Sequence, residues 1–269
     1  MPYVDNDGVR IRWEEEGSGE PLLLIMGLGY SLEMWHRVKP LLTDKFRVIM
    51  FDNRGVGQSD VPEPGYSIPD MADDAVAVLD AAGVESAHVL GVSMGGYIAQ
   101  ALTIADPDRV RSLILGCTAC GGPDAVTAEP EVLAALTARG SMSAEEGVRV
   151  MIPFIYDANT SVEAIDEDLA LRLQNYPTEK GYMGQLQAIA SHQTYDRLHE
   201  IVAPTLVIHG QSDRLVPHAN GEDIARRIPN ARFVTLPDAS HIFFTDQPER
   251  TRIAIDGFLA EVASVGAEA

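Results

Sequence analysis

Short runs of apolar residues recur along the chain and alternate with longer segments of helical periodicity. The apolar runs are residues 21–26, 46–51, 87–90, 110–116, 204–210 and 231–236. A run that is apolar throughout is typical of a strand covered on both faces. Helical spacing is clearest at 67–82, which Gly83 closes, and at 248–262. This alternation predicts an α/β fold with a doubly wound, mostly parallel sheet.

The pattern changes after Cys120. Residues 121–198 contain no convincing buried strand, and helical segments are expected at 131–138, 143–156, 161–175 and 178–191. Strand patterning then resumes with the run 204–210. The sequence therefore predicts a core formed by residues 1–120 and 199–269, with an all-helical cap insertion at 121–198.

Ser93 lies at the centre of the segment Gly91-Val-Ser-Met-Gly95, between an apolar run and a helical segment. A serine on a sharp turn from strand to helix needs small residues two positions away on each side, which explains the two glycines. The turn also places the hydroxyl at a helix N-terminus, where negative charge is favoured. Ser93 is therefore the candidate nucleophile.

Composition restricts the function classes. The chain has 40 acidic and 20 basic residues among 269, a formal net charge of −20, so binding to nucleic acid or to anionic membranes is not expected. No signal-peptide pattern or membrane-length apolar run is present, which favours a cytoplasmic protein. The two cysteines, Cys117 and Cys120, are poor evidence for a zinc site or a disulfide framework.

A serine nucleophile needs a base and an acid that orients the base. His241 follows the last predicted strand in a loop and is the preferred base, with His192 and His218 as alternatives. Asp213 is the first acid after the strand 204–209 and is the preferred third member. Asp238 is closer to His241 in sequence, but its short loop favours a role in the turn.

These motifs together resemble the α/β-hydrolase family. The quoted segments are Gly-Val-Ser-Met-Gly at the turn, Phe-Asp-Asn-Arg-Gly-Val-Gly-Gln-Ser after an early strand, Gly-Gln-Ser-Asp before the acid, and Ala-Ser-His at the base. They occur in the order Ser93, Asp213, His241 that the family shows. The sequence is most similar to the small carboxylesterase and enol-lactonase branch, and the resemblance identifies the helical insertion with that family's cap.

The resemblance also implies an oxyanion hole formed by the backbone N–H groups of Leu28 and Met94. The loop departs from the family pattern, because Met26 stands where a histidine commonly precedes the glycine. Both donors belong to the backbone and are kept, but the substitution changes how the loop is braced.

The expected activity is cofactor-free and metal-free hydrolysis of a small-molecule carboxylic ester or lactone with a small to medium apolar acyl group. Carbon–carbon bond hydrolysis, perhydrolysis and ligand reception without turnover remain alternatives on the same framework. The sequence is also compatible with a homo-oligomer. The following residues are candidates for the pocket walls, or for ordinary packing: Trp35, Tyr97, Met142, Met151, Phe154, Tyr156 and Tyr182.

Overall fold

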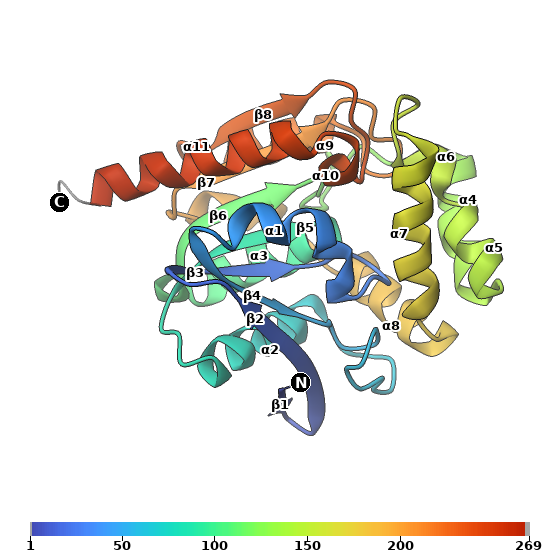
Figure 1. Ribbon diagram of the computed structural model, residues 1–269, viewed down its shortest axis with the longest axis horizontal. Coiled ribbons are helices and arrows are strands. Elements are labelled where there is room, and N and C mark those ends of the chain that lie inside the picture. Colours follow the sequence, from blue (N-terminus) through green and yellow to red (C-terminus); the bar gives the residue numbers. More distant parts are fainter. Residues whose placement is uncertain (1, 267–269) are drawn as a thin grey trace.

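A computed structural model describes residues 2–266 and contains one eight-stranded sheet (Figure 1). Its strands are β1 (Tyr3–Asn6), β2 (Val9–Glu16), β3 (Glu20–Ile25), β4 (Phe46–Phe51), β5 (Ala87–Val92), β6 (Val110–Gly116), β7 (Thr205–Gly210) and β8 (Arg232–Leu236). They lie in the order β1-β2-β4-β3-β5-β6-β7-β8.

The sheet is parallel from β4 to β8 and antiparallel at one edge, where β2 pairs with β1 and β4. β5 and β7 are buried at every position, as their apolar runs predict. The predicted mostly parallel sheet is confirmed. The sequence did not predict the edge strand β1, because its exposed and half-buried residues form no apolar run.

Helices cover both faces of the sheet. Leu23 and Ile25 of β3 pack on one face with α2 (Ile68–Ala81), α3 (Met94–Ala105) and α9 (Ala219–Arg227). Alternate residues of the same strand, Leu22 and Leu24, face the other side. The elements that cover that second side are η1 (Leu32–Arg37), α1 (Lys39–Leu42), α10 (Phe243–Asp246) and α11 (Pro248–Gly266).

The chain between β6 and β7 is helical in all its regular elements. They are α4 (Pro130–Ala138), η3 (Arg139–Ser141), α5 (Ala144–Arg149), α6 (Ile152–Ile155), α7 (Val162–Gln174), α8 (Glu179–Ala190) and η4 (Tyr195–Glu200). Helices α4 to α8 gather on the right of Figure 1, beyond one end of the sheet. The division of core and cap at residues 121 and 198 stays a prediction.

One predicted cap helix is wrong in extent. Residues 143–156 form two short helices, α5 and α6, instead of one. Pro153 is the reason, because proline lacks the N–H that a continuous helix would use there and is tolerated in the first turn of α6. Within residues 2–266, no helix is long and apolar enough to span a membrane.

Candidate active site

Ser93 occupies a strained turn between β5 and α3. Its backbone has φ 56° and ψ −121°, a conformation that residues with a side chain rarely adopt. Such strain costs about 1–3 kcal/mol and persists only where the surroundings enforce it. Here the N–H of Ser93 donates to Gly116 O at 2.9 Å, and its carbonyl accepts from Thr118 Oγ1 at 2.7 Å. The last residue of β6 and the loop after it therefore hold the turn.

The two glycines of the motif are required by close backbone contacts. A Cβ atom on Gly91 would lie 2.2 Å from Gly95 O, and one on Gly95 would lie 2.1 Å from Ile25 O. No real Cβ atom tolerates such distances, so neither position accepts a side chain without displacing the backbone. The predicted crowding on each side of the serine is confirmed.

His241 and Asp213 lie side by side in loops that follow β8 and β7. His241 Nδ1 is 2.8 Å from Asp213 Oδ2, and both residues are buried. Because the carboxylate only accepts hydrogen bonds, Nδ1 carries the proton and Nε2 is left free to act as a base. Burial alone would raise the pKa of Asp213. Interactions of the carboxylate with His241, and then with His209, outweigh the effect of burial, and the pKa is lowered.

The alternative residues lie elsewhere. Asp238 has φ 54° in the turn after β8, and His241 bonds to Asp213 instead. His192 packs edge-on against Tyr97, and His218 contacts Thr235. Of the histidines in residues 2–266, His241 alone lines the cavity that Ser93 also lines.

That cavity has a volume of about 270 Å³ and lies between the end of β5 and helices α4, α6 and α8. Its walls are mostly apolar and include Met26, Val92, Leu136, Ile155, Leu186 and Ile189. Of the seven residues considered for the walls, Tyr97 and Met151 line the cavity. The other five do not, and Trp35 and Tyr182 are core residues that are almost fully buried.

The loop after β3 approaches the serine closely. A Cβ atom on Gly27 would lie 3.0 Å from Ser93 Cβ and 3.4 Å from its Oγ. Leu28 and Met94 line the cavity, and within residues 2–266 their N–H groups donate to no acceptor. Two unused donors beside a hydroxyl could stabilise an oxyanion. Their assignment to an oxyanion hole stays a prediction.

Side-chain amides brace this loop. Asn53 Nδ2 donates to Met26 O at 2.8 Å, and Gly29 N donates to Gln185 Oε1 at 2.8 Å. Gln185 Nε2 in turn donates to Arg54 O at 2.8 Å. Met26 replaces the histidine that commonly braces this loop. The side-chain amides of Asn53 and Gln185 hold the loop backbone instead.

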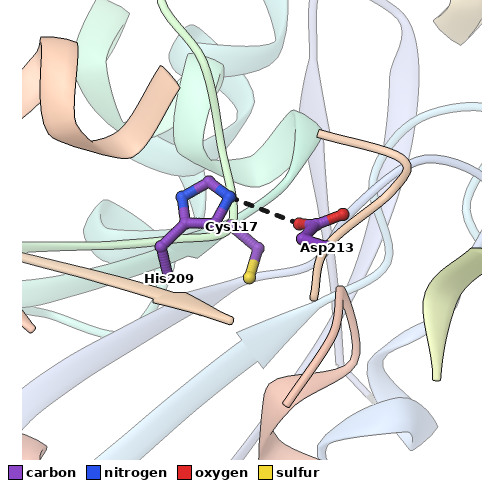
Figure 2. A group of neighbouring side chains, drawn as sticks. All are labelled: Cys117, His209 and Asp213. Atoms are coloured by element: carbon purple, nitrogen blue, oxygen red, sulfur yellow. Dashed lines mark ion pairs between the residues drawn. The ribbon is translucent and has the colours of Figure 1, made fainter. Parts of the chain in front are cut away.

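A second histidine supports Asp213. Figure 2 shows His209, Cys117 and Asp213 grouped together, with His209 Nε2 3.3 Å from Asp213 Oδ2. The same Nε2 lies 2.8 Å from Val216 O and therefore donates its hydrogen. Asp213 Oδ1 accepts from the N–H groups of Leu215 and Val216. Both carboxylate oxygens are thus engaged by the protein.

The same three side chains offer ligand atoms within 4.8 Å of one another, a spacing that a metal ion could use. Burial, and then the charge of Asp213, raises the pKa of the Cys117 thiol well above its usual range. Its Sγ also accepts from Gly210 N at 3.3 Å. A metal ion held by this group would require the thiol to lose its proton.

Sequence reasoning missed His209 and Gln185. His209 is the penultimate residue of β7, where side chains approach the sheet's carboxyl edge. Its place four residues before Asp213 was an available signal. Gln185 gave no signal, because its contacts are with residues more than 100 positions away.

Comparisons with known proteins found similar sequences and similar folds. The sequence profile described as the alpha/beta hydrolase fold matches residues 20–248. A protein of Azorhizobium caulinodans, named as the carbamate hydrolase RutD, is 30% identical over 97% of this chain and 99% of its own length.

Two solved structures are similar over almost the whole chain. The enol-lactonase from Burkholderia xenovorans has a TM-score of 0.85 and 26% identity, over 96% of this chain and 100% of that one. A thermophilic esterase from Thermogutta terrifontis has a TM-score of 0.83 and 31% identity, over 97% and 98%. The three proteins are named for hydrolysis of a carbamate, an enol-lactone and an ester. Similarity to them therefore does not identify the bond that this chain cleaves.

Proposed function

Because the chain belongs to the α/β-hydrolase fold family, we propose that it is a serine hydrolase that cleaves a carboxylic ester or lactone through an acyl-enzyme on Ser93. The observation that carries the proposal is the 2.8 Å contact between His241 and Asp213 at a cavity that Ser93 and His241 both line. A receptor would need neither this pair nor the strained serine.

The reaction follows from the groups present. His241 Nε2 removes the Ser93 proton as Oγ attacks the acyl carbon, and the N–H groups of Leu28 and Met94 stabilise the oxyanion. Protonated His241 gives its proton to the departing alcohol oxygen. Water, deprotonated by the same nitrogen, then attacks the acyl-enzyme, and the acid leaves as Ser93 regains its proton. Asp213 remains ionised and keeps Nδ1 protonated throughout.

The mostly apolar walls support an acyl group of small to medium size. An ester or lactone is favoured over a carbamate because two of the similar proteins carry esterase and enol-lactonase names with TM-scores above 0.8. Carbon–carbon bond hydrolysis and perhydrolysis would use the same nucleophile and remain alternatives within the family.

The test is hydrolysis of p-nitrophenyl acetate and p-nitrophenyl butyrate by the wild type and by Ser93→Ala, with a fluorophosphonate probe for reactive serines. We expect Ser93→Ala to lower turnover by up to about a million-fold, as loss of a triad nucleophile does, and to abolish labelling. The control Ser141→Ala removes an exposed hydroxyl that bonds only Ala138 O and should leave both readouts unchanged.

Activity retained in Ser93→Ala would contradict the mechanism. Labelling of Ser93 without ester turnover would direct the search to lactones and to substrates with a cleavable carbon–carbon bond. A protein that is neither labelled nor active would instead be a ligand receptor.

A further inference from the structure

Exposed residues mark the opening of the cavity. Of the described residues that line it, only Val126, Thr127 and Leu133 are exposed, and the others are buried or half-buried. Val126 and Thr127 belong to residues 123–129, which lead into α4 and form no helix or strand. We call residues 123–129 the mouth segment. A side chain that is held at this opening limits how far a ligand can extend out of the cavity.

One buried side chain, that of Asn220 in α9, holds the backbone of the mouth segment. Asn220 Oδ1 accepts from Val126 N at 2.9 Å, and Asn220 Nδ2 donates to Val126 O at 2.9 Å. A side-chain amide offers both an acceptor and donors, so the two bonds together fix the position and the orientation of the Val126 backbone. Asn220 is 5% exposed and itself lines the cavity.

The other long-range polar contacts of the mouth segment lie near its two ends. Asp124 and Glu129 form ion pairs there, but their side chains are 61% and 63% exposed. Exposed ion pairs contribute little to stability. Among residues 126–129, the N–H of Val126 is the only backbone N–H that donates a hydrogen bond within residues 2–266. The position of Val126 therefore depends largely on Asn220.

A local structural role does not account for these contacts of Asn220. Its backbone N and its Nδ2 both donate to Pro217 O, at 2.9 and 3.0 Å, and these two bonds serve the turn at the start of α9. The bonds to Val126 span 94 positions and add nothing to that turn. Pro217 lines the cavity and follows Asp213 in the same loop. Asn220 thus joins the mouth segment to the loop that carries the candidate acid.

We propose that Asn220 is a positioning residue that determines which acyl-chain lengths are accepted, because it holds Val126 at the opening of the cavity. This inference rests on the proposed function, since it concerns the substrate of the same cavity. While the mouth segment is fixed, the Val126 side chain restricts a chain that extends beyond the cavity, and short acyl groups are favoured. Without the two bonds, the segment can move outward and admit longer chains.

The test compares p-nitrophenyl octanoate with p-nitrophenyl acetate, and its readout is the ratio of the two kcat/KM values, octanoate over acetate. We expect Asn220→Ala to raise this ratio by about tenfold or more, the discrimination that one methylene group commonly gives in an apolar pocket. The change should come mainly from a lower KM for the octanoate. A merely structural role of Asn220 would lower both kcat/KM values together and leave the ratio unchanged.

Val126→Ala tests whether Asn220 acts through this side chain. It shortens the side chain at the opening and leaves the two backbone bonds intact, so it should raise the ratio as well. In the double variant the ratio should be no higher than in Asn220→Ala, because both substitutions remove the same obstacle. Effects that multiply in the double variant would show that Asn220 acts elsewhere.

Asn159→Ala is the matched control. It removes an exposed side-chain amide that bonds only Asp157 among the described residues and does not line the cavity, so the ratio should stay unchanged. Asn220→Asp keeps an acceptor for Val126 N but loses the donor to Val126 O, and it should give an intermediate ratio. It replaces the Ala variant if thermal denaturation shows that variant to be unfolded.

A ratio that Asn220→Ala leaves unchanged would overturn the proposal, and so would effects that multiply in the double variant. Failure of the proposed hydrolase activity is recognised separately, by the absence of ester turnover and serine labelling in the wild type. Calorimetry with Ser93→Ala, with and without Asn220→Ala, then compares the Kd values of the two esters. Because this comparison does not require turnover, the same shift in favour of the octanoate is expected there.

Discussion

At the scale of single residues, the site depends on how firmly Asp213 is held. Its carboxylate receives two backbone N–H groups and His241, and His209 Nε2 lies within 3.3 Å. His209 also ties the loop itself through Val216 O. In the proposed mechanism the acid orients the histidine, so a residue that fixes the acid and its loop would contribute to turnover without touching substrate.

We therefore expect His209→Leu to lower kcat for p-nitrophenyl butyrate by up to about tenfold, the value of a hydrogen bond between uncharged groups, with KM nearly unchanged. His209→Gln keeps a donor toward Val216 O and should recover most of the loss. Steady-state kinetics, with thermal denaturation to verify folding, measures both. Equal losses in the two variants would mean that His209 only fills space.

Residue chemistry could be predicted where the backbone dictates it. Ser93 with its glycines, Asp213 and His241 follow strand ends, and the structure brings Asp213 and His241 into contact. The burial of Arg139, in η3, could not be predicted. The rings around its guanidinium group belong to Tyr30, Tyr176 and Tyr182, which are distant from it in sequence. No local pattern indicates that a helix-terminal arginine is buried.

At the scale of elements, α8 contacts the loop after β3 and the loop after β4. Gln185 is fully buried and connects Gly29 N in one loop to Arg54 O in another. The loop that carries Leu28 is therefore positioned in part by a cap helix. The position of this helix and the geometry around Ser93 are coupled through one side chain.

Gln185→Ala should leave a buried donor and a buried acceptor unsatisfied and lower the free energy of unfolding by about 1–3 kcal/mol, with a fall in kcat as the loop loosens. Gln187→Ala, on the exposed side of the same helix, should change stability by less than about 0.5 kcal/mol. Urea denaturation and ester kinetics report the two effects. Matching behaviour of the two variants would argue against the bracing role.

Element boundaries were predictable where the signals are local. The strand 46–51 and the strand 110–116 lie where their apolar runs predict. Residues 35–42 have the spacing of a short amphipathic helix, but the structure has the 3-10 helix η1, which begins at Leu32, followed by α1. The short α10 was missed since four residues carry no periodicity.

At the scale of the whole molecule, the excess of acids is not confined to the surface. Burial raises the pKa of Asp246 to about 6, although hydrogen bonds from Thr160, Ser240 N and Asp157 N oppose the shift. A carboxyl group with a raised pKa takes up its proton more readily in the folded state. Its contribution therefore favours folding below about pH 4 and is lost as the pH rises through about 6.

The difference in unfolding free energy between the wild type and Asp246→Asn should consequently change by up to about 3 kcal/mol between pH 4 and pH 7. The wild type should lose stability relative to the variant as the pH rises. Any hydrogen bonds lost in the variant add a constant offset and do not affect this change. Denaturation at several pH values, with exposed Asp108→Asn as the charge control, measures it; a constant difference would refute the assignment.

The helices between β6 and β7 interrupt the chain after Ser93 and before Asp213 and His241. A chimaera could in principle replace this whole insertion and acquire a new substrate preference while keeping every reacting group. The contact of Gln185 with Gly29 sets a condition on such exchanges. An imported insertion would have to supply its own acceptor for that N–H, at a position that does not line the cavity.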